Sequence, residues 1–323
     1  MPTKQFLQRL RSLSGRTLIT FHALGDVDAV ASALALQSVV PNSDVKSVGG
    51  ITASTRHLLE RLSLPQPKQI SFPEEVRHYN NIVLCDVSNP DLLGDYGGAI
   101  ASFKGKKFSI DHHLHNKLLK LDAHLIEYTR SSSSEIVYDL LKHSGKKITE
   151  RTALLLLSGI LLDSAFFKSA TKQTFEAFAH LLQHTRKSYY EVLELVQTKH
   201  DVSEKIARLK AVQSAKFERV GEFVVGSALA SAFELSCASA LVECGCDVAF
   251  AANLKKGRIS GVKRETLSGI SIGKIMEAAG RLMGGSGGGH ENVGGARGNA
   301  GKTQKALEEC VETTVKSLYK SIA

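Results

Sequence analysis

The chain has 323 residues and a formal net charge of +9, so it exceeds the common one-domain size of about 100 to 150 residues, and the charge favours an anionic partner. Its 43% hydrophobic and 23% charged residues are typical of globular proteins and exclude the disordered, collagen-like and coiled-coil classes. The longest strongly apolar stretch, at 153–162, is too short for a membrane span of about 20 residues. Residues 1–10 lack a secretory signal, so we expect a cytoplasmic protein with no membrane segment.

The first half of the chain alternates short apolar runs with helical patterns, which is typical of a parallel sheet covered by helices. Three runs are nearly continuously apolar, as strands buried on both faces are. The predicted strands are Thr17–Phe21, Asn81–Cys85 and Lys107–Ile110. The predicted helices are Ala29–Val40, Ser134–Lys142 and Thr152–Leu162.

A charged, amphipathic helical stretch at 189–216 indicates a connector between two domains. We therefore divide the chain into a first domain at 1–188, the helical linker at 189–216 and a smaller second α/β domain at 217–323. The second domain contains strands near Glu222–Ala230, Asp247–Leu254 and Gly257–Val262, a helix at Ile272–Met283, a glycine-rich loop at Gly284–Gly289 and a helix at Lys302–Ile322.

Acidic and histidine residues follow each of the three predicted strands of the first domain. The carboxyl ends of parallel strands line the ligand site in such sheets, so these side chains can converge. A further acid, Asp163, ends the apolar helix. The candidate residues are His22, Asp26 and Asp28 after the first strand, Asp86 after the second, and Asp111, His112 and His113 after the third.

Each aspartate alone could simply cap a helix. Capping does not explain the histidines at the same edge, whereas oxygen ligands mixed with imidazoles suit Mn²⁺, with Mg²⁺ or Co²⁺ as alternatives. Two such ions about 3.5 to 4 Å apart hold a phosphate and lower the pKa of a water molecule. The pattern therefore indicates metal-dependent phosphoester hydrolysis.

The order of these motifs resembles that of the DHH phosphoesterase superfamily. The matching segments are His22–Ala29, Val83–Asp86, Asp111–His113 and Gly159–Phe166, and Gly284–His290 resembles the G-G-G-H motif of the DHHA1 substrate-binding domain. The resemblance covers nearly the whole chain. It implies a parallel-sheet DHH domain joined to a smaller DHHA1 domain, with the active site in the cleft between them.

The resemblance also implies a role for each residue. The first metal ion would be held by His22, Asp26 and Asp86, and the second by Asp28, Asp86, His112 and Asp163, which makes Asp86 the bridge. Asp111 would orient an imidazole, and His113 would stabilise charge on the phosphate or protonate the leaving oxygen.

The second domain would bind the substrate. The implied contacts come from Gly287, Gly288, Gly289 and His290. Relatives often carry an arginine on the strand before the helix, where this chain has Val262, so Lys263 or Arg264 would substitute for it.

We therefore expect a manganese-dependent phosphodiesterase that cleaves short single-stranded RNA or DNA, similar to nanoRNases and RecJ-like exonucleases. Two domains leave no room in 323 residues for a third that would bind longer strands. The alternatives are a 3′-phosphoadenosine 5′-phosphate phosphatase, a cyclic or linear dinucleotide phosphodiesterase and, more distantly, a non-catalytic nucleotide-binding protein. A homodimer is left open.

Overall fold

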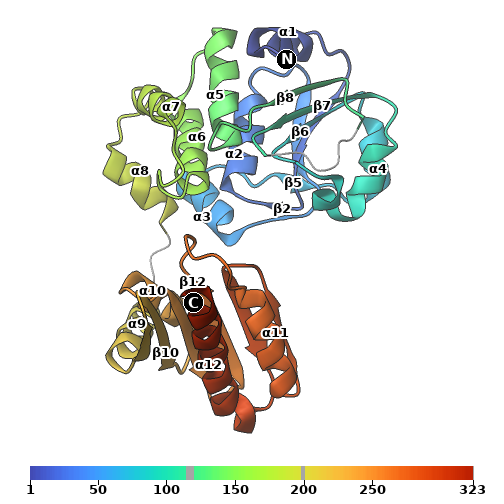
Figure 1. The fold of residues 1–323 in the computed structure, drawn as a ribbon. Coiled ribbons are helices and arrows are strands. Elements are labelled where there is room, and N and C mark those ends of the chain that lie inside the picture. Colours follow the sequence, from blue (N-terminus) through green and yellow to red (C-terminus); the bar gives the residue numbers. More distant parts are fainter. Residues whose placement is uncertain (114–119, 198–200, 323) are drawn as a thin grey trace. The chain divides into compact units, whose positions relative to one another are not determined.

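The computed structural model describes residues 1–113, 120–197 and 201–322 (Figure 1). The chain divides into two compact units, Met1–Thr198 and Lys199–Ala323. Each unit has its own six-stranded sheet and its own apolar core. The fold class predicted from the sequence, a parallel-sheet α/β domain followed by a smaller α/β domain, is confirmed.

The sheet of the first unit is parallel throughout, with the strand order β5-β3-β1-β6-β7-β8. A separate parallel pair consists of β2 and β4. The bounds are β1 Thr17–Phe21, β2 Leu24–Gly25, β3 Ser43–Ser47, β4 Gly50–Ile51, β5 Lys68–Gln69, β6 Asn81–Cys85, β7 Lys106–Asp111 and β8 Ala123–Ile126. The predicted strands are confirmed, and the third is longer by one residue at each end.

Helices cover both faces of this sheet, which explains why its central strands are mostly apolar. Ile19 and Val83 belong to the larger apolar cluster, whereas their neighbours Leu18 and Ile82 belong to a second cluster on the other face. The larger cluster packs against α1 Thr3–Arg11, α2 Val27–Leu36, α3 Ala53–Arg61, α5 Ser133–Ser144, α6 Glu150–Asp163, α7 Lys172–Leu182 and α8 Tyr189–Val196. The second packs against η1 Pro73–His78, η2 Pro90–Tyr96 and α4 Gly97–Ala101.

Helix α2 begins two residues before the predicted start and ends four residues before the predicted end. The carboxylate of Asp26 accepts a hydrogen bond from the backbone N–H of Ala29 at 3.0 Å, so Asp26 is the N-cap residue. The small side chains of α2 let it pack closely along α6. This close packing brings the first turn of α2 near the last turn of α6.

The second unit has a mixed sheet with the order β13-β14-β12-β11-β10-β9. Only β10 and β11 pair in parallel among its described strands. The strands are β9 Lys216–Val220, β10 Phe223–Leu229, β11 Val248–Asn253, β12 Arg258–Lys263, β13 Ser286–Gly289 and β14 Val293–Arg297. The helices are α9 Val202–Gln213, α10 Glu234–Glu243, α11 Ile272–Leu282, η3 Ala300–Lys302 and α12 Thr303–Ile322.

The prediction of a loop at Gly284–Gly289 is wrong from Ser286 onward, because these residues form strand β13, paired with β14. The glycines let this strand lie directly against α11. A Cβ atom at Gly287 would lie 1.9 Å from the carbonyl oxygen of Met276. Glycine is uncommon inside strands, so the sequence alone favours a loop.

The segment predicted as a helical connector, 189–216, contains two helices that belong to different units. Val192 and Val196 of α8 are buried in the apolar core of the first unit. Ala211 of α9 is buried in a small cluster with residues of α10 and β11 in the second. Residues 198–200 of the connector lie outside the described residues. None of the described helices is long and apolar enough to cross a membrane.

Candidate metal centre

The predicted ligands come from three neighbouring strands and two helices of the first unit. His22 follows β1, Asp86 follows β6, and His112 follows β7. Strand β6 lies between β1 and β7, and all three run in the same direction, so their carboxyl ends meet at one edge of the sheet. Helix α2 adds Asp28, and Asp163 is the last residue of α6.

One group of side chains suited to a metal ion consists of His22, Asp26 and Asp86, whose ligand atoms lie within 4.8 Å of one another. His22 Nε2 lies 3.6 Å from Asp26 Oδ2 and 3.7 Å from Asp86 Oδ2. Ligands about 2.0 to 2.2 Å from one ion are themselves separated by roughly 3 to 4 Å. The spacing therefore fits a shared cation.

A second group consists of Asp28, His112 and Asp163. His112 Nε2 lies 2.9 Å from Asp163 Oδ2, yet both atoms are buried and, within the described part of the chain, neither has a hydrogen-bonding partner. Two buried polar atoms that lie close together without a hydrogen bond are typical of the ligands of a metal ion. Asp86 Oδ1 lies 3.5 Å from the same imidazole nitrogen, so Asp86 adjoins both groups.

Asp86 has a strained backbone at the junction of the two groups. Its φ angle is +60°, in the left-handed region that side chains other than glycine rarely adopt. Its N–H donates to the carbonyl of Ile110 at 2.9 Å, and its Oδ1 accepts a hydrogen bond from Ser133 Oγ at 3.0 Å. These contacts hold the carboxylate in place although the backbone conformation is unfavourable.

The N-terminus of α5 holds the carboxylate of Asp28. The backbone N–H groups of Ser133 and Ser134 donate to Asp28 Oδ2 and Oδ1 at 2.7 and 2.9 Å, and the partial positive charge of the helix end favours an anion there. Burial and the nearby carboxylates of Asp163 and Asp86 nevertheless raise the pKa of Asp28 well above its usual value. A bound cation would relieve this repulsion.

The two adjacent histidines have different surroundings. His112 Nδ1 lies 3.3 Å from the carbonyl oxygen of Arg130, which favours a proton on Nδ1 and leaves Nε2 free to bind a metal. Burial lowers the pKa of His112, but the carboxylates of Asp163, Asp28 and Asp86 outweigh that effect and raise it to about 9. The contact with Arg130 cannot be predicted from the sequence, because any residue type can supply a backbone carbonyl.

His113 lies beside Asp111, as the resemblance implies for an orienting carboxylate. His113 Nδ1 is 2.9 Å from Asp111 Oδ1 and 3.3 Å from Asp86 Oδ1. Hydrogen bonds with Asp111 and Asp86 raise the pKa of His113 to about 11. Asp111 is fully buried, whereas the side chain of His113 is 49% exposed. His113 is therefore a cationic side chain that a ligand at this edge can reach.

The predicted substrate residues Gly287, Gly288 and Gly289 lie on β13, and His290 follows this strand with an exposed side chain. The backbone at His290 is fixed on both sides: its N–H donates to Val293 O at 2.8 Å, and its carbonyl accepts from Gly273 N–H at 2.9 Å. The exposed imidazole of His290 therefore projects from a turn whose backbone is hydrogen-bonded to β14 and to the first turn of α11.

Lys263 and Arg264, the two candidates for the missing arginine, differ in accessibility. The ammonium group of Lys263 donates to the carbonyl of Leu267 and lies 3.9 Å from Glu291, and the side chain is only 2% exposed. Arg264 is exposed and pairs with Asp247 at 3.3 Å. Lys263 is therefore engaged inside the unit, which favours Arg264 of the two for substrate contact.

Ser133→Ala is expected to weaken Mn²⁺ binding about 10-fold to 100-fold, because the hydroxyl that positions Asp86 is lost while every ligand remains. Isothermal titration calorimetry measures the effect. Ser144→Ala at the other end of α5 is the control, since its hydroxyl donates to Leu141 O and accepts from Lys146 N–H, and neither partner is a predicted metal ligand. Equal Mn²⁺ affinity in Ser133→Ala and wild type would show that Asp86 does not need this contact.

Two family models match the chain. The model of the DHH family, N-terminal domain, matches residues 16–160, which contain every predicted metal ligand except Asp163. The model of the DHHA1 domain matches residues 243–316, which contain β13 and His290. The two matches lie in different units and together cover about two thirds of the chain.

Two curated relatives are similar in sequence. An uncharacterised protein of Methanocaldococcus jannaschii is 27% identical over 314 residues, which are 94% of this chain and 93% of that protein. A probable manganese-dependent inorganic pyrophosphatase of Staphylococcus epidermidis is 26% identical over 222 residues, which are 65% of this chain and 68% of that protein.

Solved structures with the same fold span both units. An exopolyphosphatase-related protein from Bacteroides fragilis has a TM-score of 0.71 at 16% identity and covers 98% of this chain and 97% of its own. The exonuclease RecJ bound to manganese has a TM-score of 0.52 at 14% identity, with 99% of this chain and 96% of that chain covered. With a DHH domain at residues 16–160 followed by a DHHA1 domain at 243–316, the chain belongs to the DHH family of phosphoesterases.

Proposed function

We propose that this protein is a manganese-dependent phosphodiesterase that degrades short single-stranded oligonucleotides. The observation that carries the proposal is the pair of ligand groups that meet at Asp86, one with His22 and Asp26 and the other with His112. Two ions held by a common carboxylate are the arrangement that phosphoester hydrolysis uses. Oxygen and imidazole ligands without thiolates favour Mn²⁺ among the divalent ions.

The residues that would hold each ion follow from the two groups. The first ion would be bound by His22, Asp26 and Asp86. The second would be bound by Asp28, His112, Asp163 and the bridging Asp86. When bound, the ions would neutralise charge on the phosphodiester and lower the pKa of a bound water molecule, so that hydroxide is available at neutral pH.

The chain itself supplies orientation and charge. Asp111 holds the imidazole of His113 at 2.9 Å, and the raised pKa keeps this group protonated at neutral pH in the metal-free protein. A half-exposed imidazolium beside Asp86 is placed to stabilise charge on a phosphate oxygen or to donate a proton to the leaving oxygen. Removing His113 should therefore affect kcat more than metal binding.

The second unit would bind the substrate rather than perform the chemistry. Its match to the DHHA1 domain supports this division, since all of the proposed metal ligands belong to the first unit. We assign His290 and the exposed Arg264 to the phosphate or nucleotide of the chain end. The relationship to manganese-dependent pyrophosphatases supports the choice of metal, and the fold shared with RecJ supports a nucleic-acid substrate.

The substrate assignment is tested with end-labelled RNA and DNA of two to twenty nucleotides, alongside pyrophosphate and 3′-phosphoadenosine 5′-phosphate, each with Mn²⁺ and with EDTA. We expect mononucleotides to appear fastest from the shortest oligomers, and no product with EDTA. Hydrolysis of pyrophosphate alone would overturn the proposal in favour of the activity of the relative from Staphylococcus epidermidis.

His290→Ala is expected to separate substrate binding from chemistry. Loss of one charge-assisted hydrogen bond to a phosphate costs roughly 1.5 to 3 kcal/mol, or about 10-fold to 150-fold in kcat/KM on a dinucleotide. Turnover of bis-p-nitrophenyl phosphate, which is too small to need a second binding site, should stay at the wild-type rate. Equal losses on both substrates, or weaker Mn²⁺ binding, would place His290 in the catalytic centre instead.

A further inference from the structure

Strand β9 is the last strand of the second sheet, and its outer edge has no neighbouring strand in the described part of the chain. Its first four residues, Lys216 to Arg219, are all exposed, and only Val220 is buried. Phe217 is 73% exposed, which is unusual for an aromatic side chain on a strand. An open edge with a large exposed aromatic residue is a surface onto which another strand can be added.

The backbone groups of β9 that face outward can be identified. On the neighbouring strand, the N–H and the carbonyl of Val224 both bond Asp247 at 2.8 Å, so they point away from β9. Arg219 lies opposite Val224 in the antiparallel register, so its backbone groups are not used by β10 and point outward. Because pairs alternate along an antiparallel ladder, the backbone groups of Phe217 also point outward.

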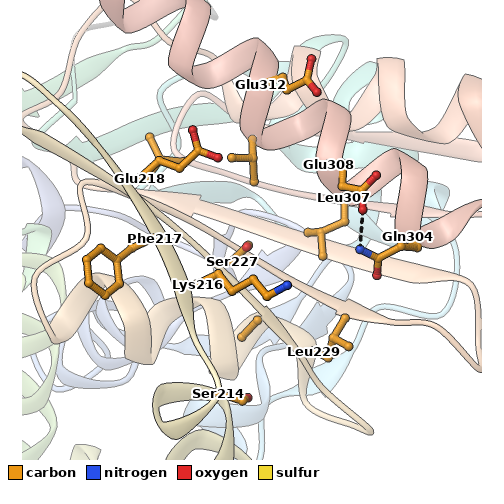
Figure 2. Close-up of a pocket in the computed structure, with 13 residues that line it drawn as sticks. Ser214, Lys216, Phe217, Glu218, Ser227, Leu229, Gln304, Leu307, Glu308 and Glu312 are labelled. Atoms are coloured by element: carbon orange, nitrogen blue, oxygen red, sulfur yellow. Dashed lines mark hydrogen bonds between the residues drawn. The ribbon is translucent and has the colours of Figure 1, made fainter.

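The side chains of β9 alternate between the two faces of the sheet. Lys216, Phe217 and Glu218 all border a groove that residues of α12, including Glu308 and Glu312, complete (Figure 2). Figure 2 shows the ring of Phe217 directed away from Lys216. The outer edge therefore presents a cation and an anion on one face, two residues apart, with an aromatic ring between them on the other face.

We propose that this edge binds a second copy of the chain through an antiparallel, two-fold pairing of β9 with β9, with Phe217 on the axis. This pairing places Lys216 opposite Glu218 of the second copy, and the same ion pair is repeated on the other side of the axis. The outward backbone groups of Phe217 then bond those of its counterpart. The two sheets are joined at β9 into one sheet of twelve strands, and the open edge at 216–218 is paired.

Charge selects this register over its neighbour. A two-fold axis at Glu218 would also leave the outward groups of Phe217 and Arg219 free to pair, but it would place two Glu218 carboxylates opposite each other. Like charges directly opposite are destabilising, whereas opposite charges stabilise a cross-strand pair. Charged residues on an edge usually prevent pairing, but here their signs are complementary to a copy of the same strand.

The proposed interface is small. Only three residues of each β9, Lys216 to Glu218, pair with β9 of the second copy, and they bury less than the roughly 1,200 to 2,000 Å² of a standard interface. We therefore expect dissociation in the micromolar range. Sedimentation velocity of the full chain from about 1 to 200 µM should show a reversible monomer–dimer equilibrium. A chain that stays monomeric at about 200 µM would overturn the proposal.

Charge exchange tests the register. K216E and E218K should each weaken dimerisation by roughly tenfold, because each turns two attractive pairs into two repulsive ones. The double variant K216E/E218K restores both pairs and should return the dissociation constant to near the wild-type value. The side chains are exposed, so the variants should fold, and turnover of a small diester checks this. Failure of the double variant to restore dimerisation would contradict the proposed register.

Crosslinking tests the axis. In a C244S background, which removes the exposed native thiol, F217C should form a disulfide-linked dimer under mild oxidation, because paired Cα atoms about 5.5 Å apart suit a disulfide. R219C is the matched control on the same face, since its counterpart in the second copy would lie about 14 Å away. Equal crosslinking of both variants would contradict an axis at Phe217.

A competing surface provides the last control. Helix α9 exposes an apolar stripe that includes Val202, Ile206 and Leu209, the last of which is 70% exposed. This stripe lies on the opposite side of α9 from the buried Ala211. L209E should leave the dimer intact. A dimer that L209E dissociates and K216E does not would pair through α9, and the proposal for β9 would be wrong.

Discussion

Asp86→Asn is expected to reduce turnover by roughly 1,000-fold or more while the protein remains folded. Asp86 lies 3.7 Å from His22 and 3.5 Å from His112, so one substitution removes negative charge from both ligand groups. It also replaces an oxygen that Ser133 holds at 3.0 Å. The measurement is kcat on a dinucleotide at saturating Mn²⁺, with circular dichroism to confirm the fold.

Two variants serve as controls for Asp86→Asn. Asp111→Asn should lose only about 10-fold to 100-fold in kcat, because Asp111 contacts His113 and does not belong to either ligand group. Asp44→Asn should be nearly silent, since this carboxylate on β3 is 45% exposed and pairs with Arg16 at the surface. Wild-type turnover in Asp86→Asn at saturating Mn²⁺ would show that Asp86 does not bridge the two groups.

Gly159→Ala is expected to lower kcat about 100-fold and to weaken Mn²⁺ binding. A Cβ atom at Gly159 would lie 2.2 Å from Ser134 Oγ and 2.8 Å from Asp28 Oδ1, so these two side chains, or α6 itself, would have to shift. Such overpacking costs about 1 to 3 kcal/mol, and a displacement of about 1 Å at a catalytic group costs about 100-fold in rate. Thermal unfolding and kcat on the same preparation measure both effects.

We expect Gly159→Ala to lower stability, whereas the same substitution in the middle of an ordinary helix raises it. On intrinsic propensity alone, alanine in place of a mid-helix glycine would stabilise α6 by up to about 1 kcal/mol. Ser158→Ala is the matched control. Ser158 is the buried neighbour of Gly159, and among the described residues its hydroxyl donates to Leu154 O within the same helix. A more stable, fully active Gly159→Ala variant would contradict the close packing around Asp28.

The sequence predicted the strands of the first unit, and the edge of the sheet at which the candidate ligands gather, because two patterns coincide there. Strands buried on both faces are mostly apolar, as in Asn81–Cys85, and the charged residue that follows such a run marks the carboxyl edge of the sheet. This pattern predicts that Asp86 and His112 lie at one edge although they are 26 positions apart in the sequence. Parallel strands bring such residues together without any local signal between them.

The sequence was less informative where the site depends on backbone geometry. Nothing in the residue types shows that Asp86 adopts a φ of +60°, that Ser133 holds its carboxylate, or that the carbonyl of Arg130 contacts His112. The glycines of β13 favour a loop in the sequence, but they form a strand, because their role is close contact with α11 rather than chain flexibility. These features depend on tertiary packing, and composition and periodicity carry no information about it.

The most direct test of the two-ion centre is the number of Mn²⁺ ions bound per chain, measured by equilibrium dialysis with metal analysis. We expect two ions in wild type, one ion in His22→Ala and in Asp163→Asn, which each disable one ligand group, and weakened binding at both positions in Asp86→Asn. A wild-type protein that binds a single ion at saturation, or an Asp86→Asn variant that binds two with unchanged affinity, would contradict the two-ion centre.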